Sequence, residues 1–279
     1  MKILGFLCDL CVSVVNVLLS GSTVVFQGTH DLRIAYKTDT GMARSHNEDT
    51  LMVDEDLGLF LVADGLGGHN AGEVASAIAA DEVRCSVRQG RSAGADPFEL
   101  LNDAIFAAHE AIFRRAQRCE DLCDMGTTIV VALLDGESFL IGHVGNSRAY
   151  LVAEGTITPV TKDHSFVAEW IEEGLMTPAE ARTHKARHGL TMALGVDDEP
   201  EPVVACVPLS PPVVLVLCSD GLTEMLDDRE ILRTIEDARD LNEACNELVD
   251  RANRKGGADN ITVILIDVDG RDSSPKNPT

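Results

Sequence analysis

The chain has 279 residues, of which 45% are hydrophobic and 25% charged, a balance that is ordinary for globular proteins and excludes wholesale disorder. Its 23 Lys and Arg residues face 46 Asp and Glu residues, which gives a formal net charge of −23. A surface this negative repels phosphate backbones and anionic lipid headgroups, so composition argues against nucleic acid and membrane surfaces as partners.

Residues 1–26 are mostly apolar and do not match the rest of the chain. They could form a secretory signal, a membrane anchor or a non-essential extension that follows a mis-called start. Asp9 and Asn16 interrupt the run and no clear cleavage site follows it, which favours the extension. Residues 24–26 could also begin a short strand. We therefore treat residues 1–28 as an extension, and expect membrane association only through its apolar run.

Residues 29–269 predict one domain, because no Gly/Ser-rich or Pro-rich linker divides them. Apolar, β-branched runs predict strands at residues 58–63, 127–134, 139–144, 149–152, 213–218 and 261–268. Apolar residues at helical spacing predict helices at residues 71–88, 97–118 and 241–254. Strand blocks interleaved with helix pairs predict layered α+β architecture rather than a doubly wound parallel sheet. The polar tail, residues 270–279, is predicted to be disordered.

The eight cysteines are scattered along the chain. Cys8 and Cys11 form a lone C-x-x-C pair without a second pair or a nearby histidine, which argues against zinc. We expect free, buried thiols in a reducing compartment, and therefore a cytoplasmic protein.

Three aspartates stand at the ends of predicted strands. Asp64 and Asp220 each follow an apolar run, and Asp259 directly precedes another. One Asp-Gly after a strand is most often only a turn, but three such sites are more informative, because strand ends can bring distant residues to one sheet edge. Converging carboxylates repel one another unless cations neutralise them. Oxygen ligands without suitably spaced His or Cys indicate Mg²⁺ or Mn²⁺ rather than zinc.

A short segment upstream gathers Arg44, Glu48 and Asp49. The planar guanidinium of Arg44 suits phosphate oxygens, and the two carboxylates could bind metal directly or hold metal-bound waters. The alternative is a solvated turn with a weak surface ion pair.

Seven short motifs follow one another between residues 33 and 268: RSHNED, ADGLGGHNAGEVAS, MGTTIV, HVGNSRAY, TKDHSFV, LCSDGL and GGADNITV. In order and spacing they resemble the metal-dependent Ser/Thr protein phosphatases (the PPM or type 2C family), particularly the bacterial branch. The resemblance implies a four-layer αββα sandwich, in which two central antiparallel β-sheets are flanked by helices. It also implies a centre of two Mn²⁺ or Mg²⁺ ions at one edge of that sandwich.

The resemblance also implies a role for each site residue. Asp64 would bridge both ions, and the carbonyl of Gly65 would bind one of them. Asp220 and Asp259 would bind the other ion. The flap beside the active site, which is mobile in the family, would correspond to residues 166–190.

The remaining residues of the upstream segment also acquire implied roles. Glu48 and Asp49 would lie mainly behind metal-bound waters. Arg44 would bind the substrate phosphate and neutralise its oxygens as the ester bond breaks. The resemblance requires no cysteine nucleophile.

Two departures from the family pattern qualify the transfer. Many members have histidine where this chain has Leu66, so His69 becomes the candidate acid for the leaving group, with a structural role as the alternative. His164, beside the flap, is a second possible aid with the same alternative. The family usually has aspartate at the position of Asn146, where it binds a third, weaker ion. A neutral amide there predicts a weak or empty third site.

The leading interpretation is a phosphatase that hydrolyses phosphoserine and phosphothreonine on proteins with water activated by two cations, opposing a bacterial Ser/Thr kinase. Its expected partners are phosphorylated proteins and that kinase. The alternative is a weakly active or non-catalytic phosphoprotein-binding regulator on the same fold, which Asn146 favours. A metal-dependent phosphodiesterase is the third possibility, because a two-metal site does not by itself distinguish monoesters from diesters.

Overall fold

A computed structural model of the chain describes residues 22–25, 31–67, 71–196, 200–209 and 213–268. Most of its strands belong to two large sheets whose neighbouring strands all run antiparallel. The first sheet has the order β1 (Ser22–Val25), β2 (Asp31–Asp39), β13 (Ile261–Val268), β12 (Val213–Cys218), β9 (Arg148–Ala153) and β10 (Thr156–Pro159). The second has the order β11 (Val203–Pro208), β8 (Ser138–Val144), β7 (Ile129–Asp135), β4 (Leu59–Ala63) and β3 (Thr50–Asp54). A short ribbon pairs β5 (Gly65–Leu66) with β6 (Gly126–Thr127).

The alternation of side chains along the central strands determines how the layers stack, because successive residues of a strand point to opposite faces. On β12, Leu215 and Leu217 belong to the apolar cluster between the two sheets. Val214 and Val216 belong to a second cluster, which packs against helices. The inner strands are therefore apolar on both faces, as strands buried between two layers must be.

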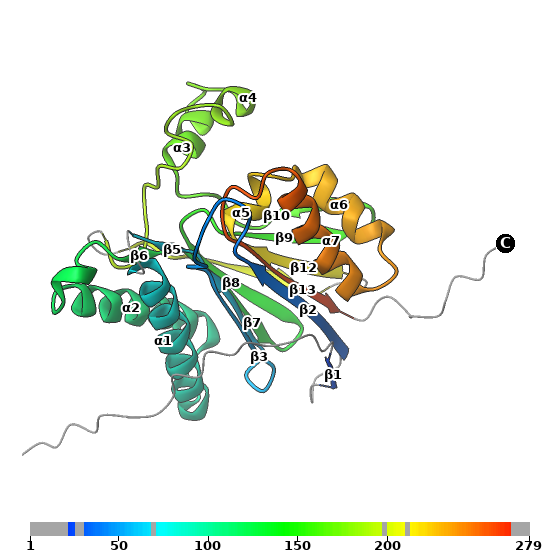
Figure 1. The fold of residues 1–279 in the computed structure, drawn as a ribbon. Coiled ribbons are helices and arrows are strands. Elements are labelled where there is room, and N and C mark those ends of the chain that lie inside the picture. Colours follow the sequence, from blue (N-terminus) through cyan, green and yellow to red (C-terminus); the bar gives the residue numbers. More distant parts are fainter. Residues whose placement is uncertain (1–21, 26–30, 68–70, 197–199, 210–212, 269–279) are drawn as a thin grey trace, which may run out of the picture.

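Two pairs of helices cover the outer faces of the sheets (Figure 1). Helices α1 (Ala71–Ala93) and α2 (Pro97–Ala116) cover the five-stranded sheet, and α6 (Asp228–Asp237) and α7 (Leu241–Arg254) cover the six-stranded sheet. The predicted four-layer αββα sandwich is thus confirmed. The short elements are η1 (Glu120–Leu122), α5 (Asp220–Thr223), α3 (Phe166–Glu172) and α4 (Pro178–Ala181).

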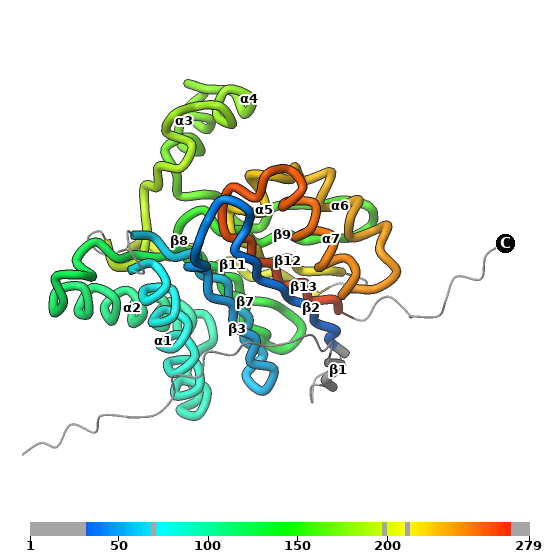
Figure 2. The backbone as a smooth tube through the Cα atoms, in the orientation of Figure 1, coloured from blue at the N-terminus to red at the C-terminus, as the bar shows by residue number. Residues whose placement is uncertain are grey.

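The last two of these helices form an arm that extends away from the four layers, as the backbone trace shows (Figure 2). The arm corresponds to the predicted flap, residues 166–190. Its near end is fixed, since Arg148 Nε and Nη2 donate to the two carboxylate oxygens of Asp163 at 2.7 and 2.6 Å. We keep the name flap for residues 166–190.

The predicted helices and buried strands are confirmed within a few residues, and β12, β13 and α7 have the predicted bounds. The predicted strand 127–134 is divided instead, because Thr128 separates β6 from β7. Five strands were not predicted, namely β2, β3, β5, β10 and β11. Three of the five, β3, β10 and β11, lie at edges of the two large sheets, where one flank is open and the strand is short or only partly buried.

At the N-terminus, β1 pairs with β2, so the strand expected at residues 24–26 is found slightly earlier. Predictions for residues 1–21 and 270–279 lie outside the described residues. No helix in the described ranges is long and apolar enough to cross a membrane.

The cysteines of the described residues are free. Cys218 and Cys245 are buried, as expected. Cys85, Cys123 and Cys206 are exposed, so the expectation of buried thiols is wrong for these three. Cys85 lies on the outer face of helix α1, where an amphipathic helix meets solvent.

Candidate metal and phosphate site

A cavity of about 500 Å³ opens where several strands of the two sheets begin or end. Its walls include seven of the ten predicted site residues: Arg44, Glu48, Asp64, Gly65, Asn146, Asp220 and Asp259. Asp49 lies behind this cavity, where its carboxylate accepts hydrogen bonds from Ser219 and Thr262. His69 lies outside the described residues.

The three aspartates converge because of strand pairing. The end of β12 lies beside the start of β13, since Cys218 pairs with Val263, and this brings Asp220 close to Asp259. Asp64 comes from the other sheet, directly after β4. Its carbonyl accepts hydrogen bonds from the Thr128 amide at 2.9 Å and from Thr127 Oγ1 at 2.8 Å. Two hydrogen bonds to its carbonyl therefore hold the backbone that presents Asp64.

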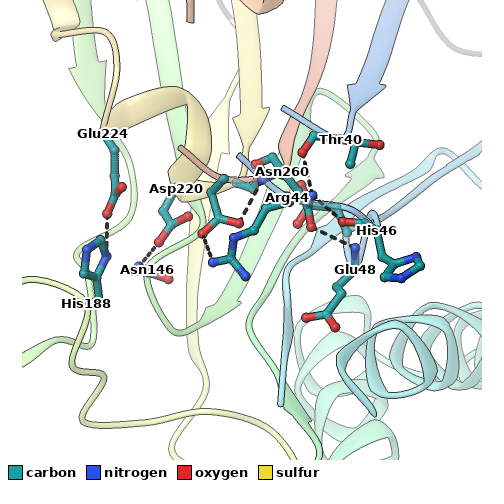
Figure 3. Close-up of polar contacts among 12 residues, drawn as sticks. Thr40, Arg44, His46, Glu48, Asn146, His188, Asp220, Glu224 and Asn260 are labelled. Carbon is teal, nitrogen blue, oxygen red and sulfur yellow. Dashed lines mark hydrogen bonds and ion pairs between the residues drawn. The ribbon is translucent and has the colours of Figure 1, made fainter. Parts of the chain in front are cut away.

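The loop that carries Arg44 is fixed by one side chain, Asn260 (Figure 3). Its Nδ2 donates to the carbonyls of Thr40 and His46, both at 2.9 Å, and its Oδ1 accepts from the Glu48 amide at 2.8 Å. Residues 40–48 are thus tied to the residue that precedes β13, so Arg44 and Glu48 reach the cavity from a defined position.

Burial and mutual repulsion raise the pKa of the clustered carboxyl groups. For Asp64, burial raises the pKa well above its ordinary value, and the negative charges of Asp49, Asp220 and Asp259 raise it further. Burial also raises the pKa of Asp220, and the charge of Asp259 adds to the effect. The cluster therefore concentrates negative charge that only bound protons or cations can neutralise.

Asp49 shows the same effect despite two hydrogen bonds. Thr262 Oγ1 and Ser219 Oγ donate to its Oδ2 at 2.6 and 2.8 Å, which favours the charged form. Burial outweighs both bonds and raises the pKa of Asp49 to about 7. Its Oδ1 atom is buried and has no hydrogen-bond partner.

The donor set fits divalent cations. Asp220 Oδ1, like Asp49 Oδ1, is buried without a hydrogen-bond partner, and such an atom is costly to bury unless something binds it. Carboxylate oxygens from Asp64 and Asp259 line the same cavity, together with Gly65. Hard oxygen donors of this kind are those that Mg²⁺ and Mn²⁺ prefer.

Arg44 and Asn146 each bind one of the predicted metal-binding aspartates. Arg44 Nη2 donates to Asp259 Oδ2 at 2.7 Å, and Asn146 Nδ2 donates to Asp220 Oδ2 at 2.7 Å. The sequence predicted that Arg44 would meet a phosphate, whereas here it neutralises Asp259. Half of the Arg44 side chain stays exposed, so the guanidinium is still accessible from the cavity.

His164 does not line the cavity. Its Nδ1 accepts a hydrogen bond from the Gly145 amide at 3.2 Å, and its ring stacks on His143 with centroids 4.6 Å apart. Burial and, to a lesser extent, the neighbouring His143 lower the pKa of His164 to about 4. These contacts support the structural alternative for His164 rather than a role in proton transfer.

The partly buried His164 makes stability depend on pH. An unfolded histidine takes up its proton near pH 6.5, whereas His164 in the folded chain resists it until about pH 4. The contribution of His164 to the free energy of unfolding is therefore fully present above pH 6.5, and it is lost as the pH falls towards 4. We expect His164→Gln to reduce the drop in unfolding free energy between pH 7 and 4.5 by about 1 kcal/mol, allowing for partial exposure. Urea titrations at both pH values would measure it, and an unchanged drop would contradict this assignment.

Three further side chains on the cavity wall were not singled out from the sequence: Arg187, His188 and Glu224. His188 Nδ1 lies 2.7 Å from Glu224 Oε1, and the two residues come from the flap and from the residue that caps α5 (Figure 3). The flap itself was recognised by its place between motifs. Which of its residues face the site depends on tertiary structure and has no local signal.

A cysteine-dependent phosphatase needs a phosphate-binding loop with the spacing C-x-x-x-x-x-R, which the described residues do not form. The spacing C-x-x-x-x-x-R occurs twice, at Cys85–Arg91 and at Cys245–Arg251. Both pairs lie within helices, α1 and α7, so neither forms the loop that such a phosphatase needs. Burial also raises the pKa of Cys245 to about 12, which keeps it a thiol.

Comparison with known proteins identifies the family. The sequence profile described as "Protein phosphatase 2C" matches residues 43–265, a range that includes Arg44, Asp64, Asp220 and Asp259. The chain belongs to the protein phosphatase 2C family. It is an enzyme of the metal-dependent phosphatase class, and its relatives are bacterial.

Individual relatives agree with this assignment. The serine/threonine phosphatase stp of Listeria welshimeri is 36% identical over 248 residues, which cover 86% of this chain and 98% of that protein. The crystal structure of the Mycobacterium tuberculosis serine/threonine phosphatase PstP superposes with a TM-score of 0.79 at 35% identity, covering 85% of this chain and 98% of the other. A structure of the PstP catalytic domain in complex with two manganese ions gives a TM-score of 0.75 at 35% identity, with the same coverage.

Proposed function

We propose that the chain hydrolyses phosphoserine and phosphothreonine on proteins with two bound divalent cations, Mn²⁺ or Mg²⁺. The observation that carries the proposal is the convergence of Asp64, Asp220 and Asp259 on one cavity that Arg44 also lines. The carboxylates of these aspartates and the carbonyl of Gly65 would hold the ions. A protein phosphatase 2C relative with two manganese ions supports this number of cations.

Two bound cations supply Lewis acidity and lower the pKa of water, which gives a nucleophile at neutral pH. The chain's own residues hold these charges and receive the substrate. Arg44 reaches the cavity from a loop that Asn260 fixes, so its guanidinium can bind phosphoryl oxygens and neutralise the charge that develops on them. Arg44 now donates to Asp259, and its guanidinium would be free to turn towards the substrate phosphate if Asp259 held a metal ion instead.

Other residues support this arrangement. Glu48 lines the cavity, and Asp49 lies behind it on hydrogen bonds from Ser219 and Thr262, where the pair would orient metal-bound waters. His69 remains the proposed proton donor for the leaving oxygen, on the basis of its motif. We further propose that the enzyme opposes a bacterial Ser/Thr kinase in the cytoplasm.

Hydrolysis of phosphopeptides tests the proposal directly. We expect phosphate release from phosphoserine and phosphothreonine peptides with Mn²⁺ or Mg²⁺, and none with a chelator. A phosphodiester such as bis-p-nitrophenyl phosphate, supplied under the same conditions, should react far more slowly. Hydrolysis that is unchanged by the chelator would contradict the metal mechanism, and binding without turnover would favour the phosphoprotein-binding regulator.

Asn146 gives a prediction about activity at high metal concentration. Asn146→Asp replaces a donor to Asp220 with a second carboxylate, which should strengthen metal binding beside Asp220. We expect its phosphopeptide turnover to rise a few-fold at millimolar Mn²⁺. Asn146→Ala, which removes the same hydrogen bond without adding charge, is the matched control and should show no rise. Equal turnover in Asn146→Asp and wild type across a Mn²⁺ titration would contradict this prediction.

A further inference from the structure

A second group of possible metal ligands adjoins the predicted two-metal site. One nitrogen of His188 and one carboxylate oxygen each from Asp220 and Glu224 lie within 4.8 Å of one another. Within the described residues, no other set of three histidine, cysteine or carboxylate side chains meets this limit. Figure 3 shows His188 and Glu224 facing each other beside Asp220.

Two of these ligands are held at a fixed spacing by the backbone. Asp220 begins α5 and Glu224 caps it, and the Glu224 amide donates to the Asp220 carbonyl at 2.8 Å, the hydrogen bond of a helical turn. Residues four apart lie on the same side of a helix, so both carboxylates face the same space. Like charges at this spacing destabilise a helix, unless a cation lies between them.

The local environment favours a bound cation. Asp220 Oδ1 is buried and has no hydrogen-bond partner, which leaves one strong acceptor unsatisfied beside Glu224. His188 is about half exposed and Glu224 partly exposed, so an ion can reach the group from solvent.

We propose that His188 and Glu224, together with Asp220, which this group shares with the two-metal site, bind an additional divalent ion, and that an ion bound there fastens the flap to α5. Two ligands of one ion are separated by at most about 4.2 Å when each bond is about 2.1 Å, so small side-chain rotations complete the site. A histidine nitrogen among the ligands favours Mn²⁺, Co²⁺ or Zn²⁺ over Mg²⁺, which prefers oxygen alone.

Such a site would act on the far end of the flap. The near end is already fixed by Arg148 and Asp163. His188 lies close to the other end, where its contact with Glu224 joins the flap to α5. An ion at this point would hold the flap wall of the cavity in place, and the concentration of a transition metal would set the fraction of molecules in which it is held.

Spectroscopy of bound Mn²⁺ on the full chain tests the proposal without any substrate, so its outcome does not depend on the proposed phosphatase activity. The two-metal site offers oxygen ligands only, whereas His188 offers nitrogen. We expect pulsed EPR at saturating Mn²⁺ to show ¹⁴N coupling in wild type and to lose it in His188→Gln. His184→Gln, a histidine of the same flap that contacts Trp170 instead, is the matched control and should retain the coupling.

Equilibrium dialysis of Mn²⁺ supplies the second measurement. We expect His188→Gln and Glu224→Gln each to lose one bound ion per chain relative to wild type, while the remaining ions bind with unchanged affinity. Hydrogen exchange of residues 176–190 should slow with Mn²⁺ in wild type and His184→Gln, but not in His188→Gln. Equal stoichiometry in all the variants, with no ¹⁴N coupling in wild type, would overturn the proposal and leave a metal-free hydrogen bond between His188 and Glu224.

Discussion

Asp220→Asn is expected to lower phosphopeptide turnover by about a hundredfold or more at saturating Mn²⁺, since metal sites are sensitive to loss of a single ligand charge. Asp220 is the carboxylate on which the site depends most. It faces Asp259 and Asp64 on one side and Glu224 on the other, and its Oδ1 atom has no hydrogen-bond partner. Its loss therefore affects both the predicted two-metal site and the group that contains His188.

The same substitution should stabilise the metal-free fold. An amide at position 220 removes one negative charge from a repelling cluster, and the hydrogen bond from Asn146 can still be accepted by the amide oxygen. With chelator present we expect Asp220→Asn to melt above wild type, whereas added Mn²⁺ should raise the melting temperature of wild type more than that of the variant.

Calorimetry and a Mn²⁺ titration of turnover measure these effects together. Asp237→Asn, which removes an exposed carboxylate at the end of α6, is the matched control and should leave turnover and its metal dependence unchanged. Wild-type turnover in Asp220→Asn would contradict the proposed role. Unfolding of metal-free Asp220→Asn together with a loss of turnover would also contradict the proposed role, because the loss would then be due to a folding defect.

Gly41→Ala should cause the largest loss of stability among the single substitutions considered, about 2–4 kcal/mol. Gly41 has φ of +78°, and a Cβ there would lie 2.1 Å from the Asp259 carbonyl oxygen and 2.9 Å from that of Gly257. Both obstacles are backbone atoms, and the turn is also held by hydrogen bonds from the Met42 and Ala43 amides to Gly257. The chain cannot accept the methyl group without moving the segment that presents Asp259.

Gly94→Ala provides the matched control for this prediction. Gly94 has a similar φ of +72°, but nothing lies within 4 Å of the position that its Cβ would take. Gly94→Ala should therefore lose only about 1 kcal/mol of stability, which is the conformational cost of placing alanine at a positive φ. Urea denaturation of both variants separates the two contributions. Equal losses would show that the close approach of the Gly41 turn to Asp259 does not matter for stability.

Turnover of Gly41→Ala adds a functional measurement. Because Arg44 follows this turn and donates to Asp259, displacement of the turn should weaken phosphate binding as well as metal binding. We expect a raised KM and a raised Mn²⁺ requirement below the melting temperature. Wild-type KM in a folded but destabilised variant would show that the turn contributes to stability alone.

The fold could be predicted largely from local patterns. The runs that became β4, β12 and β13 are apolar on both faces because each lies between two layers, and this composition is visible without any tertiary information. Edge strands such as β3 and β11 are only partly buried; β3 has polar residues at both ends and β11 ends in a proline, so neither gives a strong strand signal. Helix α2 was predictable because Asp96 caps it and Pro97 begins it.

The sequence by itself also indicated that Asp64, Asp220 and Asp259 would meet, since strand ends can bring distant residues to one edge of a sheet. Only the tertiary structure decided how they are paired: Arg44 binds Asp259, and Asn146 binds Asp220. Only it placed His188 beside Glu224, because a contact between a flap and a short helix depends on the path of the backbone in space. The local sequence indicates burial and spacing. His188 and Glu224 are 36 residues apart, and a contact over that separation depends on how the whole chain packs.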